Sequence, residues 1–259
     1  MIPPGAVAGL SAALEAAVGG GRPSDPTAAA ARRTFHLKAV LDGQHAGNGP
    51  RQRRPHDAAS VRGVLLGQAF AADVAASHHP AVEEVVAGTL AAVGSERPAD
   101  PGSASAWLNA CPREEREHLS TEVAAVLADV RTLWPPLPRE HLTVEVRGTR
   151  RVRLDSDRVT VVARPDVVLD SHRRDERARA VVVITRTGMP QPVADRRLAR
   201  ASALVHTLAT GRPPFRWILL HLTDGRLEVE DLAMDVLHAT AADLGQRLAD
   251  ADAATGSLR

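Results

Sequence analysis

The pattern of hydrophobic and polar positions changes character near the middle of the chain. Before about residue 134, apolar residues recur every three or four positions, which is the spacing of amphipathic helices. After about residue 142, short runs of β-branched residues alternate with turn-forming residues, as in strands. Two segments rich in turn-forming residues, Asp42–Ser60 and Gly94–Ser103, are predicted to be a loop and a linker. Helices are predicted in the first half at Ala6–Val18, Thr27–Leu41, Val61–Ala76, Pro80–Val93 and Pro112–Leu133.

The second half is predicted to form a sheet crossed by one helix. Val159–Ala163 and Val167–Asp170 flank an Arg-Pro pair, and they are either two paired strands or one strand with a bend. Pro192–Thr210 carries an apolar stripe at helical spacing and is followed by Gly211, a common helix terminator. Strands are expected near residues 142–147, 159–170, 180–185, 216–222 and 226–231.

Helices followed by strands predict an α/β fold with a central mixed β-sheet flanked by helices and an N-terminal helical cap. A chain of 259 residues, 44% of them hydrophobic, is long enough to bury such a core. We expect N-terminal helices and a mobile basic loop over residues 1–60, and a helical cap region over 61–138. The α/β core with a C-terminal helix is expected over 139–259.

Composition excludes several classes of protein. The single cysteine, Cys111, rules out an internal disulfide framework and a cysteine zinc site, and it suits a reducing cytoplasm. No uncharged apolar run approaches the roughly 20 residues that a membrane span requires. We therefore expect a cytoplasmic protein with no membrane partner.

Charge is distributed unevenly although the formal net charge is only +1. Residues 147–216 hold sixteen arginines against seven acids, whereas residues 217–259 hold three arginines against eight acids. The basic middle either binds a polyanion or is neutralised by the acidic tail within the fold, and both readings stay open. The candidate nucleic-acid-binding residues are Arg173 and Arg174 in a loop and Arg196, Arg197 and Arg200 on the predicted helix.

Two short motifs lie next to predicted strands of the second half. Arg164-Pro165-Asp166 lies between two predicted strand runs, and Thr187-Gly188 follows the predicted strand near 180–185. The arrangement resembles the RecB-like branch of the PD-(D/E)xK nuclease superfamily, in which an aspartate ends one strand and (D/E)-x-K with Thr-Gly ends the next. The resemblance covers about Thr143–Leu232, roughly a third of the chain. It implies a restriction-endonuclease-like core, DNA as the ligand, and Mg²⁺ or Mn²⁺ as the cofactor of an active member.

The residues at the family's catalytic positions differ from its pattern. Asp166 is in place, but the carboxylate position holds Ile184 and the lysine position holds Arg186. Residues two apart on a strand point the same way, so both substitutions affect one site. A single carboxylate binds Mg²⁺ weakly, and an arginine with a pKa above about 12 cannot act as a base. The family's histidine, glutamine and tyrosine positions fall at or near Gly67, Arg197 and Ala201.

Three functions are compatible with these residues. The first is a catalytically silent nuclease-like protein without a cofactor, in which Asp166 and Arg186 form an ion pair and which binds nucleic acid or a helicase or ATPase partner. The second is an active Mg²⁺- or Mn²⁺-dependent nuclease with migrated ligands, of which Glu145 is a candidate. The third is a protein-interaction scaffold that makes no contact with nucleic acid. Other candidates for a migrated ligand are Asp155, Asp157 and Glu228.

Overall fold

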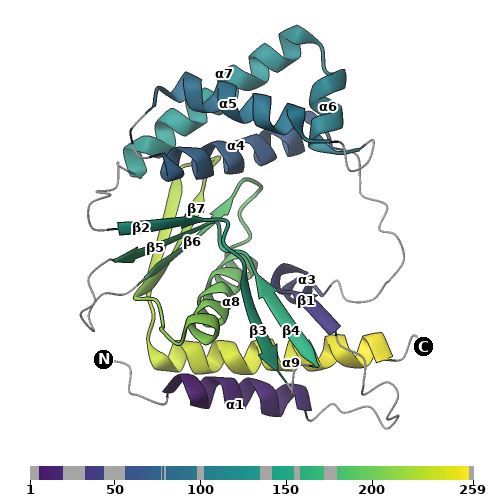
Figure 1. Ribbon diagram of the computed structural model, residues 1–259, viewed down its shortest axis with the longest axis vertical. Helices are drawn as coiled ribbons and strands as arrows, with labels where there is room; N and C mark the ends of the chain where they lie inside the picture. The colour runs from purple at the N-terminus through teal and green to yellow at the C-terminus, as the bar shows by residue number, and fades with distance from the viewer. Residues whose placement is uncertain are drawn as a thin grey trace.

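The computed structural model describes residues 6–19, 33–43, 56–76, 78, 80–97, 102–134, 142–154, 158–171 and 180–256. These residues form an α/β fold in which mixed sheets lie between helices, as the sequence predicts. Figure 1 shows a helical cap on one side of a five-stranded sheet and further helices on the other side.

The five-stranded sheet has the order β2-β5-β6-β7-β8. β6 and β7 are parallel and the other neighbours are antiparallel. Parallel neighbours need a crossover connection, and α8 (Pro192–Thr210) provides it, ending at Gly211 with φ 70° in the left-handed region. The strands are β2 (Leu142–Val146), β5 (Val167–Ser171), β6 (Val181–Arg186), β7 (Arg216–His221) and β8 (Arg226–Asp231).

A second sheet of three strands has the order β1-β4-β3, with β1 (Arg33–His36), β3 (Arg150–Leu154) and β4 (Val159–Ala163). The β3–β4 and β2–β5 pairings share one register, so the two pairs are halves of a single long hairpin. The main-chain N–H of Arg147 donates to the carbonyl of Asp166 at 2.8 Å and bridges the two halves. Residues 159–170 are therefore one strand with a bend, and the alternative interpretation as two strands paired with each other is wrong.

The bend in this hairpin follows from three residues. Pro165 has no main-chain N–H and cannot donate to a sheet ladder. Arg147 has φ 52°, a left-handed conformation that interrupts an extended strand. A Cβ on Gly148 would lie 1.8 Å from Oε1 of Glu145, so no larger residue fits there without displacing that carboxylate. The chain consequently turns from one sheet into the other, as Figure 1 shows for β3 and β4.

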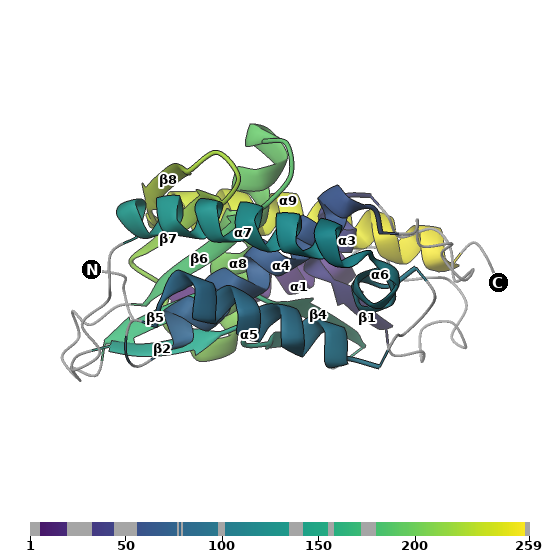
Figure 2. The same cartoon turned by 90° about the horizontal axis from the view of Figure 1, so that it is seen from above.

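The cap consists of α4, α5, α6 and α7, which lie across one face of the five-stranded sheet (Figure 2). Their buried side chains form one hydrophobic cluster with Val167, Val183 and Leu220 of the sheet. α6 and β3 were not predicted from the sequence. The bounds of the cap helices are α4 (Ala58–Ala75), α5 (Val82–Ser95), α6 (Ala104–Ala110) and α7 (Arg113–Leu133).

The helix expected at Thr27–Leu41 is wrong for residues 33–36 and correct for Leu37–Leu41. Residues 33–36 form β1, which pairs in parallel with β4, and only α3 (Leu37–Leu41) is helical. The cause is tertiary: Arg33 is buried and its Nη1 lies 2.5 Å from Oδ1 of Asp252 near the end of the chain. Residues 27–32 lie outside the described part of the chain.

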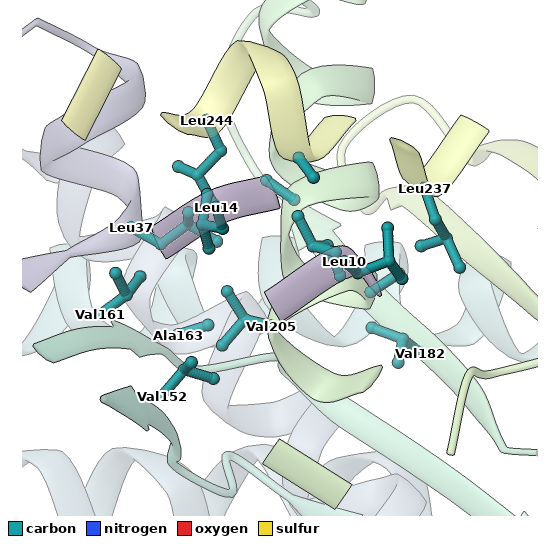
Figure 3. Packing of buried hydrophobic residues seen from close by; sticks show 14 of the residues in the cluster. Leu10, Leu14, Leu37, Val152, Val161, Ala163, Val182, Val205, Leu237 and Leu244 are labelled. Carbon is teal, nitrogen blue, oxygen red and sulfur yellow. The ribbon is translucent and has the colours of Figure 1, made fainter. Parts of the chain in front are cut away.

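The main hydrophobic core lies on the opposite face of the sheet, between α8, α9 (Met234–Gly256) and α1 (Ala6–Gly19). Figure 3 shows Leu14 of α1 beside Leu244 of α9, and Leu10 of α1 between Val205 of α8 and Leu237 of α9. The first helix thus packs against the last one and not within the cap. Among the described residues, no helix is long and apolar enough to cross a membrane.

Candidate functional site

The three catalytic positions that the nuclease resemblance implies, held here by Asp166, Ile184 and Arg186, lie together at one end of the sheet. Asp166 immediately precedes Val167, the cross-strand partner of Val183, so the register brings Asp166 beside Ile184 on β6. Arg186 lies two residues further along β6 and points to the same face as Ile184. That face is the one covered by α8.

Asp166 lies in a largely desolvated environment. Burial raises the pKa of this carboxyl above its usual value. The main-chain N–H of Thr185, which donates to Oδ2 at 2.7 Å, and the charges of Arg147 and Arg186 act in the opposite direction. Desolvation is the larger effect, so the ionised form of Asp166 is disfavoured relative to an exposed aspartate.

Ile184 belongs to the hydrophobic core and not to a polar site. Its side chain is only 3% exposed and lies in the cluster that contains Leu204 of α8 and Leu219 of β7. A branched hydrocarbon in this place offers no oxygen to a metal ion, and it contributes to packing between the sheet and α8.

Arg186 joins the sheet to the first turn of α8. Its Nε donates to Oδ1 of Asp195 at 2.5 Å, and Oδ2 of Asp195 accepts the main-chain N–H of Gln191 at 2.8 Å. Asp195 is 1% exposed. The ion pair expected between Arg186 and Asp166 is therefore wrong, because the buried carboxylate of Asp195 takes the guanidinium.

Helix α4 reaches this end of the sheet through two glycines one turn apart. A Cβ on Gly63 would lie 2.8 Å from Oγ1 of Thr187, and one on Gly67 would lie 3.7 Å from a guanidinium nitrogen of Arg147. Gly67 is the position at which the resemblance places the family's histidine. Here the space beside it holds Arg147, whose charge acts on Asp166.

Glu145, the candidate migrated ligand, is held by an arginine. Arg150 donates to both of its carboxylate oxygens, with Nη1 at 2.8 Å from Oε1, and this pairing lowers the pKa of Glu145. Nε of Arg150 also donates to Nδ1 of His206 on α8 at 3.3 Å. Burial, together with the charge of Arg150, lowers the pKa of His206 to about 4, so this histidine is neutral at pH 7.

These residues do not fit a divalent cation. Glu228, another candidate for a migrated ligand, is engaged by Arg196 and Arg226. In the described part of the chain, no three His, Cys, Asp or Glu side chains are close enough to hold a metal ion. Asp155 and Asp157 lie outside the described residues.

The three arginines predicted on α8 are each paired with an acid from the C-terminal part of the chain. Arg200 makes two hydrogen bonds to Glu230, at 2.7 and 2.9 Å. The two remaining pairs are Arg196 with Glu228 at 2.8 Å and Arg197 with Asp243 at 3.4 Å. Neutralisation within the fold, one of the two readings of the charge pattern, therefore occurs on this helix. Arg173, Arg174 and the three arginines within residues 51–54 lie outside the described part of the chain.

Three polar residues near the site were not singled out in the sequence: Arg147, Arg150 and His221. His221 lies in register with Arg186, is 1% exposed, and has no hydrogen bond to either ring nitrogen in the described part of the chain. The sequence does contain a signal for Arg150, because Arg150-Arg151-Val152-Arg153-Leu154 ends in the alternation of polar and apolar residues that predicts a strand. No sequence signal indicates His221, since its burial depends on which elements pack together.

Comparison with known proteins does not assign a family. No protein-family model matches the chain, and no curated protein matches it. One solved structure, described as the crystal structure of SSO0001, is similar over 80% of this chain and 82% of that one, with 13% sequence identity and a TM-score of 0.27. A similarity of this size supports no conclusion about fold or function.

Proposed function

We propose that this protein is a nuclease-like fold of the PD-(D/E)xK type that has lost its metal site and acts by binding nucleic acid. The observation that carries the proposal is Ile184, a core residue at the position where a second carboxylate would complete a metal site beside Asp166. Arg186, at the position of the family's catalytic lysine, forms an ion pair with Asp195.

The order of elements supports the resemblance. A strand that begins just after Asp166, a strand followed by Thr187-Gly188, the crossover helix α8 and the parallel strand β7 succeed one another as the family pattern requires. The helices of the cap precede the sheet, as they do in that family.

The two other functions have less support. An active nuclease with migrated ligands would need free carboxylates, and Glu145 and Glu228 are both held by arginines. A scaffold without nucleic-acid contact is favoured by the ion pairs of α8, although a different surface of the molecule is strongly basic, as argued below.

The metal site is tested by restoring the family pattern. We expect the wild-type protein to show no Mn²⁺ binding by calorimetry in the micromolar range and no Mn²⁺-dependent cleavage of DNA. The double variant Ile184→Asp, Arg186→Lys should bind Mn²⁺ measurably, because two carboxylates would face one cation. It should also be less stable without metal, since a carboxylate would replace a packed isoleucine, and Mn²⁺ should restore that loss.

The matched control is the same double variant with Asp166→Asn added. It carries the same disruption of the core but only one carboxylate, so it should be destabilised without gaining Mn²⁺ affinity. Tight Mn²⁺ binding by the wild type, or equal Mn²⁺ binding by the double and triple variants, would show that the site is placed wrongly.

A further inference from the structure

The residues on the exposed face of the three-stranded sheet include arginines and, within the three described strands, no acid. β1, β3 and β4 read RTFH, RRVRL and VTVVA, and none of them contains an acid. Alternation along the strands buries Val152, Leu154, Val159 and Val161 in the main core. The alternate side chains point away from the core and form two cross-strand rows, Thr34–Thr160–Arg153 and His36–Val162–Arg151. We call these six residues, with Arg164 at the end of β4, the basic sheet face.

Among the described residues, the helices that share a hydrophobic cluster with these strands lie on their other side. The buried residues of β3 and β4 share a cluster with residues of α1, α3 and α8. On the basic sheet face, Thr34, His36, Arg151, Arg153 and Arg164 are exposed. Figure 1 shows β3 and β4 running from the five-stranded sheet toward α9, with β1 beside β4.

Two arginines of this face differ electrostatically from the inward-pointing arginines of the same sheet. The inward-pointing Arg33 and Arg150 are paired with Asp252 and Glu145. Arg151 and Arg164, in contrast, form no ion pair with any residue that the structure describes. An arginine that the fold leaves unneutralised is available to an external anion.

The spacing of these cations suits a chain of phosphates. Arg164 lies two residues beyond Val162, the cross-strand partner of Arg151, which places it about 7–8 Å away on the diagonal. Thr34 and Thr160 add hydroxyl donors of the kind that contact phosphate oxygens in protein–DNA interfaces.

We propose that the basic sheet face binds the sugar-phosphate backbone of a nucleic acid. The proposal rests on the binding role proposed above and names the surface that performs it. A membrane surface is disfavoured, because interfacial binding needs exposed large apolar side chains. In the described part of the chain those lie elsewhere, at Leu133, Met189, Val193, Phe215, Leu227 and Val229.

The test is a salt titration of binding to a fluorescently labelled duplex and to the corresponding single strand. For the duplex, the logarithm of affinity should fall linearly with the logarithm of salt concentration, by about 0.9 per phosphate contacted. The variant Arg151→Ala, Arg164→Ala should reduce this slope by about two, one for each lost contact. The single strand should show the same ordering of variants with a smaller slope of about 0.7 per phosphate.

The charge-matched control is Arg97→Ala, Arg212→Ala, which removes two exposed arginines away from the face and should leave the slope unchanged. A third variant, Arg196→Ala, Arg200→Ala, tests the α8 surface instead. If that variant lowers the slope and the first does not, the basic sheet face is not the binding surface, although the protein does bind nucleic acid. Equal effects of the first variant and the control on the slope would likewise show that the basic sheet face is not the binding surface.

Failure of the broader function gives a different result. If the wild type binds neither nucleic acid at 50 mM salt, both the surface and the binding role fall, whereas the metal test of Ile184 and Arg186 is unaffected. Preferential binding to vesicles containing anionic phospholipid would assign the face to a membrane and overturn the proposal. Near-identical circular dichroism and thermal unfolding of the variants would exclude misfolding as the cause of lost binding.

Discussion

At the scale of single residues, Asp166 and Glu145 show how one face of a sheet creates opposite environments for two carboxylates. Glu145 lies across from Val168, and Asp166 is two residues before Val168, so both point toward α8. Burial raises the pKa of Asp166, whereas the bidentate contact with Arg150 lowers that of Glu145. The candidate site therefore contains one carboxylate that the fold disfavours in ionised form and one that it favours.

Neutralising these two carboxylates should change stability in opposite directions. Because the folded-state pKa of Asp166 is raised, wild-type stability falls as pH rises from about 3.9 through that pKa. Asp166→Asn should therefore increase the free energy of unfolding at pH 7, and the gain should vanish below about pH 3.9. Glu145→Gln should decrease it at pH 7 by up to about 1 kcal/mol, a difference lost as pH falls below about 4.3 through the lowered folded-state pKa. Urea denaturation at pH 7 and near pH 3 measures both, and a loss of stability in Asp166→Asn at pH 7 would contradict the desolvation argument.

Gly148 should be required for the contact between Glu145 and Arg150. A Cβ at this position would lie 1.8 Å from Oε1 of Glu145, so Gly148→Ala should displace the carboxylate and cost about 1 kcal/mol. In a Glu145→Ala background the cost should disappear. Gly88→Ala on α5 is the control of opposite sign: nothing lies within 4 Å of its Cβ, and alanine should stabilise the helix by about 0.5–1 kcal/mol. Thermal unfolding of the four variants tests the assignment, and an undiminished cost without Glu145 would refute it.

At the scale of elements, long-range polar contacts decide where the two ends of the chain lie. Arg33 at the start of β1 bonds both Oδ1 and the carbonyl oxygen of Asp252 on α9, and Arg158 bonds Oδ2 at 3.3 Å. Asp252 is 3% exposed and the two arginines are 9% exposed. One buried carboxylate thus ties the last helix to the three-stranded sheet and fixes β1 beside β4.

Removing this carboxylate should destabilise the whole fold. Asp252→Ala would leave Arg33 buried without its acidic partner, and loss of one member of a buried ion pair costs about 3–5 kcal/mol. Asp250→Ala, two residues earlier on the same helix, is the matched control: Asp250 is exposed and should matter by less than about 0.5 kcal/mol. Equal effects of the two substitutions on chemical denaturation would show that the buried contact does not anchor α9.

At the scale of the whole molecule, the acidic C-terminal part of the chain screens one basic surface and leaves another exposed. β8 and α9 supply the acids that pair with Arg196, Arg197 and Arg200. On its buried side the three-stranded sheet pairs with Asp252 and Glu145, whereas Arg151 on its outer side pairs with no acid that the structure describes. The fold thus converts a chain of net charge +1 into a molecule with a local basic face.

Removing the acids that pair with the arginines of α8 should create a second surface that binds anionic ligands. Glu228→Gln combined with Glu230→Gln would leave Arg196 and Arg200 without their carboxylates, so affinity for duplex DNA should rise and its salt dependence should steepen by one to two units. The control, Asp235→Asn with Asp250→Asn, makes the same change in net charge on α9 and not on β8, and it should have a much smaller effect. Fluorescence anisotropy at several salt concentrations measures the affinity of each variant for the duplex. Equal gains in affinity in the two double variants would indicate a response to net charge alone.

The sequence by itself determined the elements whose signals are local. The apolar stripe of Pro192–Thr210 and the terminating Gly211 predicted α8 with its observed bounds, because helix periodicity and termination depend on neighbouring residues. The chemistry at Ile184 and Arg186 was also readable, since residue type and spacing on one strand decide which side chains share a face.

Tertiary structure alone decided which distant groups meet. β1 replaced a predicted helix because Arg33 finds Asp252, 219 residues away, and because β4 offers a strand to pair with. Residues 159–170 bend because the opposite strand turns at Arg147 and Gly148. Arg186 bonds Asp195 and not Asp166 because the first turn of α8 places a buried carboxylate within reach. A charge carries no mark of its partner along the chain: it pairs with whichever opposite charge packing brings within about 4 Å, and only the folded chain sets those distances.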